Sequence, residues 1–354
     1  MPSLAFLQID RYPTYGLFLT IVVAAVTAGA LFPFWIRLVR YRNIGQQVRA
    51  DGPQGHLVKQ GTPTMGGVLI MLVVAAVFLT MGHTDRPSLL VLFAMLGCAM
   101  LGFVDDYAKV VKERSLGLTA LAKIAWQVIV AVSIGLLAVN WVGVSAKVSL
   151  PLLPFQLDLG VLSTSLPVGG YVLVIPWLYL ALICVMVVGF SNTVNLTDGL
   201  DGLAAGTVLI VMFAFAAIAF RQDSLPMSLI AAAVSGACIG FLWYNSYPAD
   251  IFMGDTGSLG LGAAIATLAI VTKTEFLSVL IGGIYVIEGL SVILQVLSFK
   301  LTGKRIFRMA PIHHHFEMKG WSETKIMVRF WIITGVMAGA GFALYFVSTM
   351  RGGS

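Results

Sequence analysis

Residues 192–202 read Asn-Thr-Val-Asn-Leu-Thr-Asp-Gly-Leu-Asp-Gly, and they lie between two long apolar runs, 171–190 and 203–220. These eleven residues hold two carboxylates, two carboxamides, two threonine hydroxyls and two glycines. Polar groups at this density beside membrane-length segments are costly unless they serve a function. A helix N-cap would explain one of the aspartates, but it would not explain the asparagine pair as well. The stretch therefore predicts a functional loop between two membrane spans.

The composition of the chain indicates a membrane protein. Of its 354 residues, 58% are hydrophobic and 11% are charged, whereas a soluble domain has about 25% charged residues. The mean hydropathy is +0.93. These values predict an all-α, polytopic membrane protein that forms one domain over residues 1–354. The three cysteines lie inside apolar runs without paired spacing, which is typical of small core residues and not of disulfides or metal sites.

Ten apolar segments are each long enough to cross a hydrocarbon core of about 30 Å as a helix. The first is as long as a full span and nine more follow it, which argues against a cleaved signal peptide. The segment 258–272 is short and Gly-rich, as is typical of a helix that is bent or that begins inside the bilayer. The ten segments are 16–38, 66–82, 88–104, 119–139, 170–190, 200–220, 226–244, 258–272, 276–299 and 325–348.

The basic residues are distributed unevenly between the two sides of these segments. Loops after odd-numbered segments, with the neighbouring span ends, hold 16 of the 22 lysines and arginines. The positive-inside rule therefore predicts that these loops are cytoplasmic and that both termini are periplasmic. The net charge of +6 follows from this topology and helps to hold anionic lipid or phosphate. It is not a nucleic-acid signature.

The polar motifs follow the same division. Five of them fall in loops or span ends that are assigned to the cytoplasm, whereas the outward loop 142–169 consists mostly of Pro, Leu, Val and Ser. One site on the cytoplasmic face is the simplest hypothesis. The motifs are KQGTPTMGG (59–67), DDYAK (105–109), the stretch 192–202, NSYPADIFMGDTGS (245–258) and PIHHHFE (311–317).

Each motif also has a plainer interpretation. The pair Asp105 and Asp106 could be a solvated helix end, but acidic groups at a helix C-terminus oppose its dipole, which favours a metal or phosphate role. Lys109 could simply pair with either aspartate one turn earlier. The run 59–67 could be an ordinary turn, or its hydroxyls and free N–H groups next to Lys59 could bind a phosphate.

Two further features leave alternatives open. The three consecutive histidines could be a surface run, and neighbouring basic residues and the lack of cysteine disfavour a zinc site. Glu288 lies inside the ninth segment, where an ionisable group is a functional candidate by default. It could equally be a buried structural partner, so we do not assign it to the site.

Together these residue types indicate phosphoryl transfer. Aspartate oxygens suit Mg²⁺, lysines and histidines suit phosphate, and asparagines suit a sugar or base. The hydrophobic setting suits a lipid acceptor. A Gly-x-x-x-x-Gly-Lys-Ser/Thr loop is missing from the sequence, which argues against a nucleoside triphosphatase. We therefore expect transfer from a soluble nucleotide donor to a membrane lipid.

These motifs resemble those of a known family. GTPTMGG, VDDY, NLTDGLDG, FMGDTGS and PIHHHFE, in this order, resemble the polyprenyl-phosphate N-acetylhexosamine-1-phosphate transferases. The match extends from about Lys59 to Trp321, and several long motifs in order are highly specific. The triple histidine followed by Phe316 and Glu317 resembles the branch of this family that uses a muramoyl-pentapeptide donor.

The resemblance implies the reaction and its surroundings. UDP-N-acetylmuramoyl-pentapeptide would give its phospho-sugar to undecaprenyl phosphate, yielding lipid I and UMP in peptidoglycan synthesis, with Mg²⁺ as cofactor. A homodimer in the bacterial inner membrane is also implied.

The resemblance further implies roles for individual residues. Asp255 would be the Mg²⁺ ligand, and Asp105, Asp106 and Asp198 are further candidate ligands. Asp105, Asp106, Asp255 and His314 would be catalytic. The substrate-binding residues would be Lys59, Thr64, Lys109, Lys123, Asn195, Asp198, Asp201, Asn245, Phe252, His313 and His315.

The sequence leaves the chemical route and two other protein classes open. The lipid phosphate could attack the donor directly, or an aspartate could form a covalent phospho-enzyme. Asp255-Thr256-Gly257 is similar to the aspartic-protease tripeptide, although such a site needs two carboxylates that share a proton. A transporter would gather its polar groups at the midplane. A related transferase that uses another UDP-N-acetylhexosamine is the nearest alternative.

Overall fold

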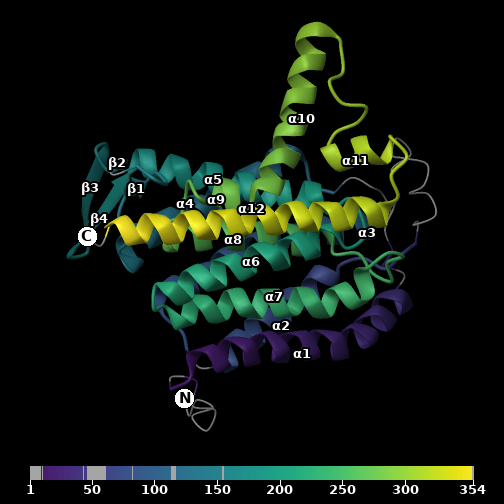
Figure 1. The fold of residues 1–354 in the computed structure, drawn as a ribbon, viewed down its shortest axis with the longest axis horizontal. Helices are drawn as coiled ribbons and strands as arrows, with labels where there is room; N and C mark the ends of the chain where they lie inside the picture. The colour runs from purple at the N-terminus through teal and green to yellow at the C-terminus, as the bar shows by residue number, and fades with distance from the viewer. Residues whose placement is uncertain are drawn as a thin grey trace.

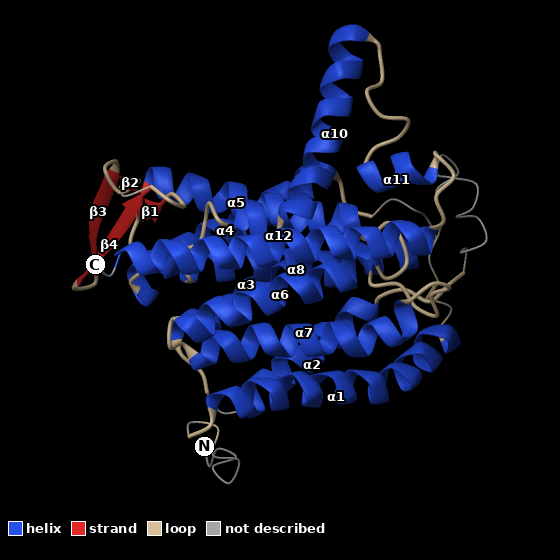
Figure 2. Cartoon of the chain, viewed as in Figure 1, coloured by secondary structure: helices blue, strands red, loops and turns tan. Residues whose placement is uncertain are grey.

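The computed structural model describes Ile9 and residues 11–42, 44–45, 61–81, 83–112, 117–153 and 155–352. These residues form a helical bundle with two small β-hairpins (Figures 1 and 2). The elements are α1 (Pro13–Tyr41), α2 (Gly66–Thr80), α3 (Arg86–Val111), α4 (Ala120–Leu137) with a π-helical extension (Ala138–Val142), β1 (Lys147–Ser149), β2 (Gln156–Asp158), β3 (Ser163–Val168), β4 (Tyr171–Pro176), α5 (Trp177–Thr197), α6 (Leu203–Arg221), α7 (Leu225–Asn245), α8 (Gly254–Val271), α9 (Ser278–Ile281), α10 (Gly283–Thr302), α11 (Ile312–Glu317) and α12 (Glu323–Gly352).

The bundle confirms the predicted all-α membrane architecture. Within the described residues, nine helices are long and apolar enough to cross a membrane, and α2 is a shorter apolar helix. The fifteen residues of α2 measure about 22 Å at 1.5 Å per residue, less than a full hydrocarbon core. We name the two ends of the bundle for what lies there (Figure 1). At the hairpin end α1 begins, α12 ends and the β-strands lie; at the motif end α3 and α5 finish and α8 begins.

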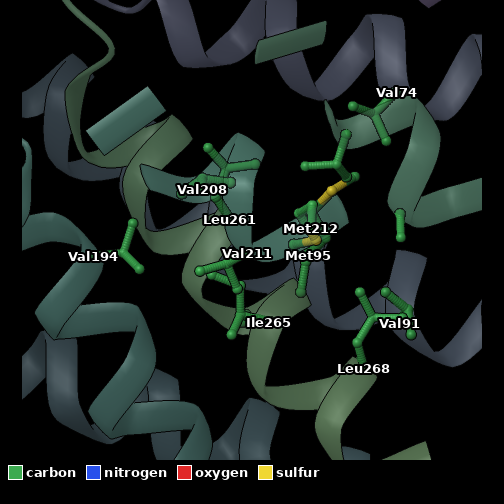
Figure 3. Close-up of a cluster of buried hydrophobic side chains, with 14 of the residues drawn as sticks. Val74, Val91, Met95, Val194, Val208, Val211, Met212, Leu261, Ile265 and Leu268 are labelled. Carbon is green, nitrogen blue, oxygen red and sulfur yellow. The ribbon is translucent and has the colours of Figure 1, made fainter. Parts of the chain in front are cut away.

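The central helix of the bundle is α8, which is buried along almost its whole length. It packs against α2, α3, α5 and α6. Figure 3 shows how apolar side chains from these helices meet around it. The labelled side chains are Val74 of α2, Val91 and Met95 of α3, Val194 of α5, Val208, Val211 and Met212 of α6, and Leu261, Ile265 and Leu268 of α8.

Glycines let the backbones approach most closely at the motif end. A Cβ atom on Gly102 of α3 would collide with the backbone of Asp255 and Thr256 in α8. A Cβ atom on Gly67 of α2 would likewise collide with the backbone of Gly257. Small residues at helix contacts allow this close approach in membrane bundles. The last turns of α3 therefore lie directly against the first turn of α8.

The predicted span 170–190 is wrong at its start. Residues Tyr171–Pro176 form β4, which pairs with β3 in an antiparallel hairpin, and the helix begins at Trp177. Gly169 and Gly170, both with positive φ, form the turn, as two-residue hairpins require. An apolar run that includes a strand cannot be separated from a helix by hydrophobicity alone.

This shift changes how the stretch 192–202 is built. The helix α5 extends from Trp177 to Thr197, so the first half of the stretch is helical and not a loop as predicted. Only residues 198–202 connect α5 to α6. The predicted span 258–272 also begins earlier, since α8 starts at Gly254 and includes Asp255 in its first turn.

The predicted span 276–299 is interrupted. The helix breaks at Gly282 into a short α9 and a longer α10. Phe190 of α5 packs against Gly282, and Met337 of α12 packs against Gly283, so neither position has room for a side chain. Beyond the break α10 leaves the bundle, and its far half projects away from the other helices (Figure 1).

Candidate active site

Three carboxylates from two helices meet at the motif end. Asp105 and Asp106 belong to the last two turns of α3, and Asp255 belongs to the first turn of α8. One ligand oxygen from each lies within 4.8 Å of the others. Across the part of the chain that the structure describes, this is the one cluster of three or more metal-ligating side chains at such distances. The contact between Gly102 and α8 is what brings the two helices' carboxylates together.

Two lysines lie among these carboxylates. Lys109 Nζ is 2.8 Å from Asp105 Oδ2 and 3.2 Å from Asp255 Oδ1. Lys123 Nζ, from the first turn of α4, is 2.9 Å from Asp105 Oδ2 and 2.6 Å from Asp255 Oδ2. With all five groups ionised, three carboxylates and two ammonium groups leave one net negative charge. The cluster therefore attracts a cation while it offers two positive groups to a phosphate.

The Asp106 carboxylate is hydrogen-bonded mainly to the first turn of α8. Its carboxylate accepts hydrogen bonds from the N–H groups of Asp255 (3.1 Å) and Thr256 (2.9 Å), and from the Thr256 hydroxyl (2.8 Å). It thus caps the N-terminus of α8, where a negative charge is favourable. Asp106 fixes the position of Asp255 and has less capacity left for a metal than its neighbours.

The two oxygens of Asp105 have different partners. Its Oδ1 accepts from the Leu118 N–H at 2.6 Å. Its Oδ2 is buried and lies 2.8 and 2.9 Å from the ammonium groups of Lys109 and Lys123. Carboxylate oxygens of this kind suit Mg²⁺. The residues present therefore fit a divalent cation held by Asp255 and Asp105, with Asp106 behind them.

Asn195 extends the cluster onto α5. Its Nδ2 donates to Asp255 Oδ1 (2.9 Å) and to Ser258 Oγ (2.8 Å). One turn earlier, Asn192 Nδ2 donates to Gln127 Oε1 of α4 at 2.9 Å. The two asparagines of the stretch thus tie α5 to α8 and to α4. Helical geometry at residues 192–197 produces this arrangement, because positions three apart share a face.

The remaining aspartates of the stretch lie beside the cluster. Burial, together with the negative charges of Asp255, Asp106 and Asp201, raises the pKa of Asp198 well above its usual range. A cation bound nearby would offset this effect. Asp201 Oδ2 accepts from the Ala249 N–H at 3.0 Å. These contacts hold the 198–202 turn against the loop that precedes α8.

Asn245 closes the same region from the end of α7. Its Oδ1 accepts from the Gly202 N–H (3.0 Å), and its Nδ2 donates to the Ile251 carbonyl (2.9 Å). Only 3% of Asn245 is exposed. Both halves of its amide are therefore engaged in joining the start of α6 to the loop before α8.

The three histidines have different hydrogen-bond partners. His313 is fully buried, and its Nδ1 lies 3.0 Å from Glu288 Oε1 of α10. His314 Nδ1 lies 2.9 Å from Glu317 Oε2. His315 Nδ1 accepts from the Arg308 N–H at 3.1 Å.

The rings of His313 and His315 have different surroundings. The His313 ring is packed against Gly199, so it contacts the 192–202 stretch directly. Loss of hydration and the positive charges of Lys319 and Arg308 lower the pKa of His315, in agreement with an Nδ1 that accepts a hydrogen bond. The histidine triplet is therefore not one uniform ligand surface.

Comparison with known proteins identifies the family of this chain. The profile of glycosyl transferase family 4 matches residues 88–273, and signature 1 of the phospho-N-acetylmuramoyl-pentapeptide-transferases matches residues 59–71. The chain is similar to the phospho-N-acetylmuramoyl-pentapeptide-transferases of Frankia casuarinae (46% identity, covering 96% of this chain and 99% of the relative) and Bacillus subtilis (46% identity, covering 88% and 92%). The chain belongs to glycosyl transferase family 4.

Ten of the fifteen predicted site residues of this family 4 member fall into two groups. The structure brings Asp105, Asp106, Asp255, Lys109, Lys123 and Asn195 into one hydrogen-bonded and ion-paired cluster. Asp198, Asp201, Asn245 and His313 lie around it, in the segments that enclose the 192–202 stretch. Lys59 lies outside the described residues.

Of the two alternatives left open for the run 59–67, a phosphate site on free backbone N–H groups does not apply to its two last glycines, because both N–H groups have carbonyl partners. The Gly66 N–H donates to the Phe252 carbonyl at 2.9 Å, and the Gly67 N–H donates to the Met253 carbonyl at 2.8 Å. The Phe252 N–H in turn donates to the Pro63 carbonyl at 2.8 Å. This part of the run, with the buried Thr64, is paired to the segment that leads into α8.

Sequence reasoning missed several residues that the structure places in or beside the cluster. Thr256 and Ser258 lie in the quoted 245–258 motif, but no role follows from their type alone. Gln127 is fully buried, and its Nε2 has no hydrogen-bond partner. The sequence could have indicated Gln127, because it is a polar amide in a mostly apolar segment, one turn after Lys123.

Proposed function

We propose that this chain transfers phospho-N-acetylmuramoyl-pentapeptide from its UDP-linked donor to undecaprenyl phosphate, giving lipid I and UMP. The observation that carries the proposal is the cluster of Asp105, Asp106, Asp255, Lys109 and Lys123 at one end of a membrane bundle. It combines cation-binding oxygens with phosphate-binding ammonium groups, and it lies where a lipid and a soluble nucleotide can both reach it. The relatives' names supply the identity of the transferred group, and the family resemblance supplies its UDP-linked donor and its lipid acceptor.

Mg²⁺ is the cation that we propose for the cluster. Asp255 and Asp105 would hold it, and when bound it would neutralise charge on the donor's pyrophosphate. Asp106 would keep both ligands in place through its hydrogen bonds to the first turn of α8. Lys109 and Lys123 would donate to phosphate oxygens of the two substrates.

The reaction that we favour is a direct displacement. A phosphomonoester has a second pKa of about 6, so the lipid phosphate is already largely dianionic at pH 7 and needs no general base. One of its oxygens attacks the donor's β-phosphorus, and the bond from that phosphorus to the bridging oxygen breaks. The bonding electrons leave with UMP. The protein's main contribution is in-line placement and charge stabilisation.

The alternative of an intramembrane aspartyl protease fits the geometry poorly. Such a site needs two carboxylates that share a proton. Here Asp105 and Asp255 both face Lys123 instead, at 2.9 and 2.6 Å. A transporter is also disfavoured, because the polar cluster lies at the end of the bundle and not at its midplane.

We further propose the orientation and setting of the protein. The positive-inside rule supports a cytoplasmic motif end in the bacterial inner membrane, with the hairpin end periplasmic. The family resemblance supports a homodimer, which cross-linking in native membranes would test.

The decisive experiment measures UMP release by purified protein. We expect release with UDP-N-acetylmuramoyl-pentapeptide and undecaprenyl phosphate, its loss in EDTA, and its recovery with Mg²⁺. UDP-N-acetylglucosamine should be a far poorer donor. Equal use of both donors would assign the protein to another branch of the transferases, and release that persists in EDTA would refute the metal role.

A further inference from the structure

Glu288 is a buried carboxylate that the proposed reaction does not use. It lies in the second turn of α10 and is fully buried. Its two oxygens have different partners in α11: Oε2 accepts from the Ile312 N–H at 3.0 Å, and Oε1 lies 3.0 Å from His313 Nδ1. Glu288 therefore holds both the first backbone N–H and the first histidine ring of α11.

The opposite edge of the same histidine ring faces Gly199, in the turn beside the carboxylate cluster. His313 is fully buried, and its Nε2 has no hydrogen-bond partner in the protein. A Cβ atom on Gly199 would lie 2.5 Å from this Nε2, so the ring edge points to the turn that follows Asp198. A buried ring nitrogen without a partner costs free energy, and a ligand in the site would remove that cost.

The pairing with Glu288 determines which nitrogen carries the proton. An ionised carboxylate accepts hydrogen bonds and cannot donate them, so Nδ1 must be the protonated nitrogen that donates to Oε1. Nε2 is then the unprotonated nitrogen, which can accept a hydrogen bond but not donate one. A neighbouring carboxylate commonly fixes the tautomer and orientation of a histidine in this way.

We propose that Glu288 is a positioning residue that acts through His313. It holds the ring with Nδ1–H toward itself, so that Nε2 accepts a hydrogen bond from a hydroxyl or amide N–H group of the donor's sugar. The inference rests on the proposed function for the identity of the donor, but the pairing of Glu288 with His313 can be tested without it.

The first test is spectroscopic and uses the unliganded protein. The chain has five histidines, so ¹⁵N-histidine labelling gives few signals, and His313→Gln identifies the one that matters. We expect a protonated Nδ1 on His313, and a change in its Nε2 shift when UDP-N-acetylmuramoyl-pentapeptide is added. An unprotonated Nδ1, or an Nε2 shift that does not change when the nucleotide donor is added, would overturn the proposal.

The second test is a double-mutant cycle on UMP release. Loss of an outer partner that orients a functional side chain typically costs roughly 10- to 100-fold, and we expect kcat of Glu288→Gln to fall within this range. If Glu288 acts through His313, the double variant Glu288→Gln/His313→Gln should be no less active than His313→Gln alone. Losses that multiply would show that Glu288 acts independently and would refute the proposal.

Glu275 provides a matched control for the burial of a carboxylate. It is also buried, but it lies beyond α8 at the hairpin end and pairs with Lys273 (2.5 Å) and the Tyr179 hydroxyl (2.8 Å). Glu275→Gln should change thermal stability without changing the kcat of folded protein.

If Glu288→Gln does not fold, the ¹⁵N spectrum of His313 in the parental protein still tests the pairing. If the parental protein releases no UMP, the proposed function fails while the ring spectrum still reports on the pairing.

Discussion

Lys123 Nζ lies 2.6 Å from Asp255 Oδ2, although the two residues are 132 positions apart in the chain. The ion pair joins the first turn of α4 to the first turn of α8, and Lys123 also lies 2.9 Å from Asp105. A lysine between two carboxylates keeps them close without a metal. Under the proposed function, a bound cation would release the same ammonium group to a phosphate.

Asp255→Asn should fold and extract normally but lose at least about a hundredfold in turnover, as removal of a key electrostatic group does. The asparagine keeps the size of the side chain and removes its charge. The measurement is Mg²⁺-dependent UMP release at matched protein levels. Asp250→Asn is the control, because Asp250 is exposed and its contact with Arg40 is long, at 3.6 Å. Near-parental activity of Asp255→Asn with an unchanged Mg²⁺ requirement would move the metal to other ligands.

Lys123→Gln should lower turnover about tenfold or more while lowering the Mg²⁺ concentration needed for half-maximal activity. The substitution removes a positive charge from the carboxylates, so they attract a cation more strongly, but a phosphate loses its partner. A Mg²⁺ titration of UMP release separates the two effects. Lys112→Gln is the control, since Lys112 is exposed at the end of α3. A raised Mg²⁺ requirement in Lys123→Gln would contradict this account.

Gly102→Ala should impair both stability and activity. Its methyl group would collide with the Asp255 and Thr256 backbone, and overpacking of this kind typically costs about 1–3 kcal/mol. Thermal unfolding in detergent measures the first effect and UMP release the second. Gly189→Ala in α5 is the control, because a Cβ atom there meets nothing within 4 Å. If Gly102→Ala were as active as the control, the close approach of α3 and α8 would not be required for the site.

Cysteine labelling can test the proposed orientation. Ser165 in β3 lies at the hairpin end and Lys112, at the end of α3, lies at the motif end, and both are exposed. A cysteine at Ser165 should react with an impermeant thiol reagent from outside the cell, and one at Lys112 should react only after the membrane is opened. Cys98 and Cys238 are buried and Cys184 lies within α5, so the parental protein supplies the background. The reverse pattern would place the cluster on the periplasmic face.

The helical class of the fold and the central part of the site could be predicted from the sequence because both have strong local signals. Long apolar runs give the spans, and Asp105, Asp106 and Asp255 are conspicuous at their ends. The β4 strand could not be separated from α5 because Tyr171–Pro176 is as apolar as the helix that follows. That boundary also decides whether Asn195 lies on a helix or in a loop.

Other parts of the site depend on tertiary contacts that no local pattern reveals. The amides of Gly66 and Gly67 could be assigned only once the segment before α8 was seen beside them. Glu288 was conspicuous as a charge within a span, but its partner His313 is 25 positions away. The different partners of the three histidines likewise depend on how α11 folds back against α10.

The hydrogen bond from the Thr256 N–H to Asp106 makes the separation of α3 from α8 measurable. The Thr256 amide hydrogen is bonded to a side chain of another helix and not to a carbonyl of its own. It can exchange with solvent only when α3 and the first turn of α8 separate, which is also the event that disperses the carboxylates. The hydrogen-exchange rate of the Thr256 amide, compared with the rates of amides deeper in α8, would therefore measure how often the site opens in the protein without substrate.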